Sequence, residues 1–174
     1  MWKENQKFKI GITVVLGLLI IGCYIMIFMF SADSAEESSA VSQKVTELLM
    51  RIYRAIFEEN SSNVSHGASS GVNITELLEK LVRKLAHFIE YMMLGSLSYL
   101  LSYLWIKKRR YCVAVIIIQL FVSAGLDEMH QSFVPGRYAS FWDVLLDLVG
   151  GMTGILLVIG IIKLKKTKKS DRLT

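Results

Sequence analysis

Three stretches of the sequence place acids, bases and amides at helical spacing inside otherwise apolar segments. They are RKLAHFIEYMMLG (83–95), DEMHQSFVPGR (127–137) and FWDVLLDLVGG (141–151). Side chains three or four residues apart lie on the same face of a helix. Such pairs are Arg83 with His87, His87 with Glu90, Asp127 with His130 and Gln131, and Asp143 with Asp147. Each stretch is therefore predicted to contribute one polar face to a helix.

These polar faces offer several kinds of chemistry. Carboxylates and imidazoles in an apolar setting can transfer protons, and the candidate catalytic residues are His87, Glu90, Asp127 and Glu128. The candidate binding residues are Arg83, Lys84, His130, Gln131, Arg137, Asp143 and Asp147. The arginines among them can hold a phosphate or a carboxylate with two parallel hydrogen bonds. Histidines and carboxylates also bind metals, but no HExxH motif is present, so neither a metal nor a cofactor is specified.

The elements that carry these residues are predicted to be membrane-spanning helices. The chain has 174 residues, of which 53% are hydrophobic, and a single proline. A helix needs about 20 mostly apolar residues to cross a bilayer. Four segments reach this length, namely residues 10–30, 85–106, 111–131 and 141–162. We therefore expect an all-α membrane protein with four transmembrane helices, in which a single domain covers residues 1–174.

The basic residues predict the orientation of these helices, because Lys and Arg near the ends of spans favour the cytoplasmic side. The N-terminal segment, residues 107–110 and the segment after residue 162 together hold 13 of the 20 basic residues and 2 of the 15 acidic ones. Four spans put all three segments on one side of the membrane. Both termini are thus expected in the cytoplasm, with residues 31–84 as an outer loop.

In that orientation the three polar faces lie at the same depth, at the outer ends of the last three spans. A charge at the bilayer centre costs about 2.5–3.5 kcal/mol, so polar faces in an apolar slab should turn toward one another. The predicted result is an outward-facing polar pocket. Structural explanations stay open, since basic side chains near helix ends can extend to the interface and the polar groups could form a salt-bridge network only.

The outer loop is predicted to contain an amphipathic helix over residues 41–58, after a capping box at residues 34–37. Apolar residues recur there at helical spacing, namely Val41, Val45, Leu48, Leu49, Ile52 and Ile56. This stripe could lie on the outer membrane surface or pack against the end of the bundle, because the same pattern serves both. Asn73 is the predicted start of the helix that leads into the second span.

The three polar stretches, in this order and on successive spans, resemble the VanZ-like family of small bacterial membrane proteins. MIFMFSADSAEESS (26–39) is similar to the family's pattern at the end of the first span. The family often has Gln at the position of Asp33 and Asn at the position of Asp147. The resemblance implies a set of pocket residues, namely Arg83, Lys84, His87, Glu90, Asp127, Glu128, Gln131, Arg137 and Asp143.

The resemblance also implies a function, because the family is similar to a protein associated with low-level resistance to teicoplanin-type glycopeptides. We expect a multi-pass protein of the bacterial cytoplasmic membrane that binds or modifies a lipid-linked cell-envelope component. The expected partners are membrane lipids or a lipid-linked cell-wall precursor at the outer leaflet, with a glycopeptide antibiotic as a further candidate and no nucleic acid. Two alternatives stay open, namely a membrane hydrolase or transferase, and a structural or partner-binding protein without catalytic activity.

Overall fold

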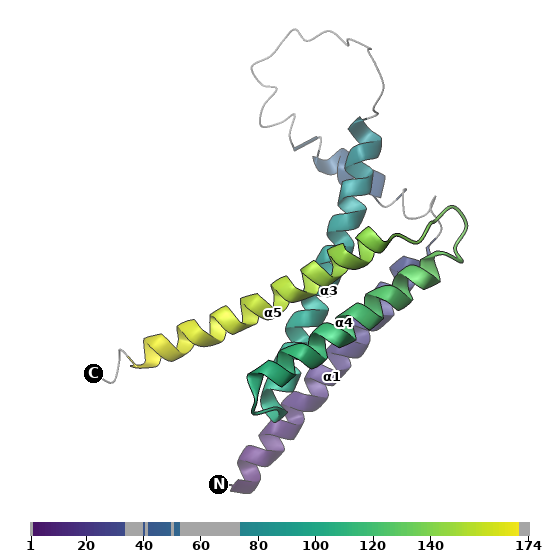
Figure 1. Ribbon diagram of the computed structural model, residues 1–174. Helices are drawn as coiled ribbons and strands as arrows, with labels where there is room; N and C mark the ends of the chain where they lie inside the picture. Colours follow the sequence, from purple (N-terminus) through teal and green to yellow (C-terminus); the bar gives the residue numbers. More distant parts are fainter. Residues whose placement is uncertain (1, 34–39, 41, 50, 53–73, 171–174) are drawn as a thin grey trace.

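The computed structural model describes residues 2–33, 40, 42–49, 51–52 and 74–170. Most of them belong to four long helices (Figure 1), namely α1 (Trp2–Ala32), α3 (Ile74–Trp105), α4 (Arg109–Gln131) and α5 (Phe141–Ser170). No strand occurs among the described residues. The predicted all-α fold class is therefore confirmed for the part of the chain that the structure describes.

Three of these helices are long and apolar enough to cross a membrane, over Gln6–Ala32, Arg109–Gln131 and Phe141–Lys168. The 23 residues of α4 extend roughly 35 Å at about 1.5 Å per residue, which is enough for a hydrocarbon layer of about 30 Å. Serines, tyrosines and charged residues along α3 lower its hydropathy, and α3 is not among the three. The predicted span at residues 85–106 stays a prediction.

α3 tolerates its polar residues because much of its surface faces protein. It contacts α1, α4 and α5, and its most extensive packing is against α5. Figure 1 shows α1 and α4 side by side, with α3 crossing next to them. Tyr91 and Leu94 of α3, Ile116 and Leu120 of α4, and Ile155 of α5 form the buried core where the helices meet.

Two of the helix boundaries match the predicted spans. α4 ends at Gln131 and α5 begins at Phe141. α3 begins at Ile74, directly after the predicted helix start at Asn73. Asn73 itself, the predicted capping box at 34–37 and residues 53–58 of the predicted amphipathic helix lie outside the described residues.

The described part of the predicted amphipathic helix, residues 42–49 and 51–52, is helical. Its polar residue Thr46 is buried, whereas Val45 and Leu48 of the apolar stripe are 40% and 57% exposed. Val45 nevertheless lines a small cavity together with Phe30 of α1 and Val82 of α3, so the stripe keeps a contact with the end of the bundle. The other described residues of the stripe are exposed, as contact with a membrane surface would require, and both expected placements stay predictions.

The loop between α4 and α5 reverses direction through a type II β-turn. The amide of Arg137 donates a hydrogen bond to the carbonyl oxygen of Val134 at 3.1 Å, which closes a four-residue turn with Pro135 and Gly136 at its centre. Gly136 has a φ of 77°, a conformation that the third position of this turn requires and that glycine adopts without steric cost. The turn places Arg137 against the end of α1.

Glycines bring the backbones of α3 and α5 into contact. A Cβ atom added to Gly95 of α3 would collide with the carbonyl group of Gly151 on α5. A Cβ atom added to Gly154 of α5 would collide with the carbonyl oxygen of Met92 on α3. Small residues allow such close packing between helices in membranes, where the hydrophobic effect does not drive helix association. The separation of α3 and α5 thus depends on the absence of side chains at these positions.

We predict that Gly154→Ala destabilises the fold by about 1–3 kcal/mol, because its new methyl group has no room against α3. Gly160→Ala is the matched control, since a Cβ atom at Gly160 meets nothing within 4 Å. Thermal unfolding in detergent can be followed with a thiol-reactive dye, because Cys23 and Cys112 are free and buried. Equal unfolding temperatures for the two variants would contradict the proposed role of the glycine contact.

Candidate functional site

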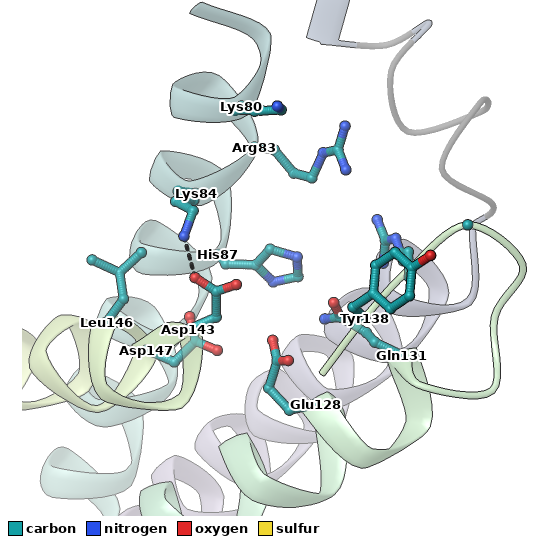
Figure 2. A pocket seen from close by; sticks show the side chains of 12 residues that line it. Lys80, Arg83, Lys84, His87, Glu128, Gln131, Tyr138, Asp143, Leu146 and Asp147 are labelled. Atoms are coloured by element: carbon teal, nitrogen blue, oxygen red, sulfur yellow. Dashed lines mark hydrogen bonds and ion pairs between the residues drawn. The ribbon is translucent and has the colours of Figure 1, made fainter. Parts of the chain in front are cut away.

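A polar cavity of about 230 Å³ lies between α3, α4, α5 and the loop before α5 (Figure 2). We call it the polar pocket. Its lining residues are Lys80, Arg83, Lys84, His87, Glu128, Gln131, Gly136, Arg137, Tyr138, Asp143, Leu146 and Asp147. All three polar stretches of the sequence therefore contribute to one cavity.

The α3 wall of the polar pocket is a helical stripe of basic residues. Arg83 and Lys84 stand three and four residues after Lys80, and His87 stands four and three residues after them, so all four residues lie on one side of α3. Lys84 donates a hydrogen bond to, and forms an ion pair with, Asp143 of α5, as the dashed line in Figure 2 shows. Both side chains are partly exposed, so this ion pair adds little stability. Its main consequence is geometric, because it joins the two walls at the mouth of the pocket.

A compact cluster of His87, Asp127 and Asp147 joins α3, α4 and α5. Each residue offers one nitrogen or oxygen atom, and these three atoms all lie within 4.8 Å of one another. Asp127 is 8% exposed and Asp147 only 2%. Two buried carboxylates repel each other and lose hydration, so a positive charge between them, on the imidazole or on a bound metal ion, would stabilise the arrangement. The cluster is thus the part of the site that could hold a metal.

Two further side chains, Gln131 and Glu90, contact the cluster residues. Gln131 donates a hydrogen bond to Asp127, with 3.0 Å between its Nε2 and the carboxylate Oδ2. Glu90 lies one turn after His87, and its Oε2 is 3.4 Å from the imidazole Nδ1. Glu90 is buried and does not line the polar pocket, but it lines a smaller neighbouring cavity of about 180 Å³ that His87 also borders. Glu90 therefore contacts the cluster from behind.

Glu128 links the end of α4 to the start of α5. Its Oε2 accepts a hydrogen bond of 2.8 Å from the backbone amide of Ser140, the residue before the first residue of α5. The first amides of a helix have no partner within the helix, so a carboxylate at this end is stabilising. Glu128 is 5% exposed and also lines the polar pocket. One side chain thus positions α5 and presents a carboxylate to the cavity.

Arg137 likewise has two roles, because it binds the end of α1 and also lines the polar pocket. Its Nη1 donates hydrogen bonds to the carbonyl oxygens of Phe30 and Ser31, at 3.2 Å and 3.1 Å. These carbonyl groups belong to the last turn of α1, where no intrahelical amide is available. Its Nε and Nη2 make no hydrogen bond to the described residues, although the side chain is buried and lines the polar pocket. Burial, followed by the nearby Arg83, lowers the pKa of Arg137, which still carries its charge at neutral pH.

His130 lies apart from the other candidate residues. Its ring stacks on Phe28 of α1, with ring centres 4.7 Å apart, and lines a separate cavity of about 460 Å³ next to α1. Asp127 borders that cavity too, so it stands between the two regions. The structure therefore brings His87, but not His130, to the polar pocket.

The sequence analysis missed four residues that line the polar pocket, namely Lys80, Gly136, Tyr138 and Leu146. Lys80 could have been found, because it stands four residues before Lys84 and seven before His87 on the same helical face. Tyr138 directly follows Arg137, but it lies outside the helices, so helical spacing could not indicate that it lines the pocket. Leu146 is an apolar residue in an apolar helix, so nothing in the sequence distinguishes it from its neighbours.

The three polar stretches occur in a fixed order along α3, α4 and α5, and known families can be searched for this order. A family model described as VanZ/LLP1 matches residues 16–163. The chain belongs to the VanZ/LLP1 family. This membership confirms the resemblance seen in the sequence, and the matched residues include the whole polar pocket. No curated protein and no solved structure matches the chain.

For this VanZ/LLP1 protein we predict that Glu128→Ala is destabilising by about 1–3 kcal/mol, because it removes the acceptor for the amide of Ser140. Glu128→Gln keeps an oxygen that can accept this bond, so it should unfold within a few degrees of the unchanged protein. Thermal unfolding in detergent measures both effects. If Gln and Ala at this position lower the unfolding temperature equally, Glu128 does not act through Ser140.

Proposed function

We propose that the chain is a multi-pass protein of the bacterial cytoplasmic membrane, with four spans and both termini in the cytoplasm. Support comes from the gathering of the basic segments at one end of the bundle. The ammonium group of Lys9 lies 4.1 Å from the ring centre of Trp105, and Arg109 lines the same cavity as Lys163. The start of α1, the α3–α4 connection and the end of α5 thus share one end, which the charge rule assigns to the cytoplasm.

The opposite end of the bundle carries exposed aromatic side chains. Tyr138 is 88% exposed, and Trp142 at the start of α5 is 76% exposed. Phe133 and Phe141 are exposed beside them. Such residues are enriched at the interface between a bilayer and water, because a ring can enter the apolar layer while its polar edge stays hydrated. In this orientation the polar pocket lies at the depth of the outer headgroups.

The pocket binds, in this proposal, the polar head of a lipid-linked cell-envelope component. The observation that carries it is a single cavity lined by cations on one wall and carboxylates on the other. Lys80 and Arg83 can take a phosphate group, and Arg83 can do so with two parallel hydrogen bonds. Glu128 and Asp147 can accept hydrogen bonds from hydroxyl or amino groups. A volume of about 230 Å³ suits a head group, with the lipid tail remaining in the bilayer.

This binding activity would link the chain to tolerance of teicoplanin-type glycopeptides. A protein that holds or alters the envelope component that such a drug targets would lower the drug's access to it. Support comes from membership of the VanZ/LLP1 family together with a pocket of suitable chemistry.

Expression in a susceptible Gram-positive host tests the proposed function. We expect the protein to raise the lowest inhibitory teicoplanin concentration at least fourfold. Glu128→Gln, which keeps the acceptor for Ser140 but removes the charge from the pocket, should abolish this rise. Glu47→Gln is the matched control, because it removes an exposed acid outside the pocket.

The proposal would be contradicted if neither the original protein nor the Glu128→Gln variant, at equal expression, changed the teicoplanin tolerance of the host. A structural or partner-binding protein predicts another pattern. In that case the Glu128→Gln variant would keep full tolerance, whereas a chain without residues 41–58 would lose it.

A second candidate function, metal-assisted hydrolysis or group transfer, is favoured by the cluster of His87, Asp127 and Asp147. One imidazole and two carboxylates within 4.8 Å resemble a three-ligand set that leaves a position for water or substrate. A metal there would activate that water, and Glu90 would orient the imidazole from behind through Nδ1.

If a metal binds, the purified protein loaded with zinc or manganese should retain about one ion per chain after dialysis. Asp147→Asn should lower this content at least tenfold, since it removes a buried ligand. Asp143→Asn is the control, because Asp143 lies one turn earlier on α5 and pairs with Lys84 outside the cluster. Elemental analysis gives the ion content. If the dialysed protein contains no bound metal, the metal hypothesis is contradicted.

A further inference from the structure

A further cavity lies at the end of the bundle opposite to the polar pocket. It measures about 600 Å³ and is formed where the end of α3, the start of α4 and the end of α5 meet. Its basic residues are Arg109, Arg110, Lys163 and Lys166, and none of its lining residues among those described is acidic. We call it the basic cavity. The proposed function does not use it.

One cationic group of the basic cavity is held against an aromatic ring of the cavity wall. The guanidinium carbon of Arg109 lies 3.1 Å from the ring centre of Tyr103, a distance at which cation and ring attract each other. Tyr99 is buried one turn away, with its ring centre 6.1 Å from that of Tyr103. Arg109 is therefore held at the cavity before any ligand arrives, which lowers the entropy cost of binding.

The start of α4 adds a second feature that favours an anion. The first turn of α4 contains no acidic residue, and its N-cap residue Lys108 makes no side-chain capping hydrogen bond. The first amides of such a helix have no intrahelical partner and carry the positive end of the helix dipole. Because Arg109 is the first residue of α4, this positive end and the guanidinium lie at the same place.

The rest of the cavity wall is apolar. Val113 of α4 and Ile159 and Ile162 of α5 line it beside the cations. A free inorganic anion gains nothing from contact with apolar side chains. A phospholipid, in contrast, has an acyl chain that packs against apolar groups. Basic pockets between transmembrane helices on the cytoplasmic side are suited to anionic lipid head groups.

We propose that the basic cavity binds one anionic phospholipid of the cytoplasmic leaflet. Its phosphate group would lie between Arg109 and the lysines Lys163 and Lys166, and an acyl chain would follow Ile159 and Ile162. Because the cavity is formed by three helices, a lipid bound there joins their ends and stabilises the bundle. This inference is independent of the ligand of the polar pocket.

The test measures thermal unfolding of the full chain in detergent with added lipid. Phosphatidylglycerol should raise the unfolding temperature by at least about 3 °C, because a ligand that binds only the folded state stabilises it. Soluble glycerol 3-phosphate should not, because it has no acyl chain. Phosphatidylcholine with the same acyl chains should not either, because its choline group cancels the charge of its phosphate and leaves no net negative charge. A rise of equal size with glycerol 3-phosphate would overturn the lipid assignment, and a rise of equal size with phosphatidylcholine would overturn the anion assignment.

A pair of double variants separates the cavity from overall charge. Arg109→Gln with Lys163→Gln should lose most of the stabilisation by phosphatidylglycerol. Lys107→Gln with Lys165→Gln removes the same charge from exposed positions outside the cavity and should keep it. Equal loss in both would overturn the proposed site.

Native mass spectrometry provides a readout that does not depend on the stability of the variants. The original protein should retain one phosphatidylglycerol after collisional activation that strips phosphatidylcholine. Arg109→Lys with Lys163→Arg, which keeps both charges, should retain the lipid to at least half of the original occupancy. Absence of a retained lipid on the original protein would overturn the inference.

Discussion

The polar pocket depends on the contact between the backbones of α3 and α5. Near this crossing, Gly95 and Gly154 leave no space between the two helices. His87 stands two turns before Gly95, and Asp147 stands about two turns before Gly154, so the crossing determines how closely the imidazole and the carboxylate approach. A larger separation of the helices would open the cluster and would also separate Lys84 from Asp143. The chemistry of the site is thus a consequence of helix packing.

Two candidate residues both join helix ends and line the polar pocket. Glu128 accepts from the amide before α5, and Arg137 donates to the carbonyl groups that end α1. These bonds fix the loop between α4 and α5 over the pocket and leave part of each side chain facing the cavity. The cluster of His87, Asp127 and Asp147 places one nitrogen or oxygen atom of each residue within 4.8 Å of the others, and the proposed proton transfer or metal binding is centred on it.

Much of the fold and part of the site could be predicted from the sequence, because helical spacing and apolar length are local properties. The last residue of α4, Gln131, and the first residue of α5, Phe141, were both predicted from these properties. The partners of Arg137 could not be predicted, since backbone carbonyl groups have no residue signature. The place of His130 could not be predicted either, because three residues of spacing leave a rotation of about 60° between side chains. That rotation turns His130 toward Phe28 and leaves Asp127 at the boundary.

The central claim is that α3 and α5 meet at a pocket that opens to the outside of the cell. A double variant, Lys84→Cys with Asp143→Cys, in a chain whose Cys23 and Cys112 are replaced by Ala, tests both parts at once. A membrane-impermeant bifunctional maleimide is applied to intact cells, and unreacted thiols are then counted with a polyethylene-glycol maleimide after lysis. We predict that both thiols are consumed by one cross-link, because the ion pair places the two positions together and the proposed orientation puts them at the outer face. Protection that appears only after the cells are permeabilised would contradict the account.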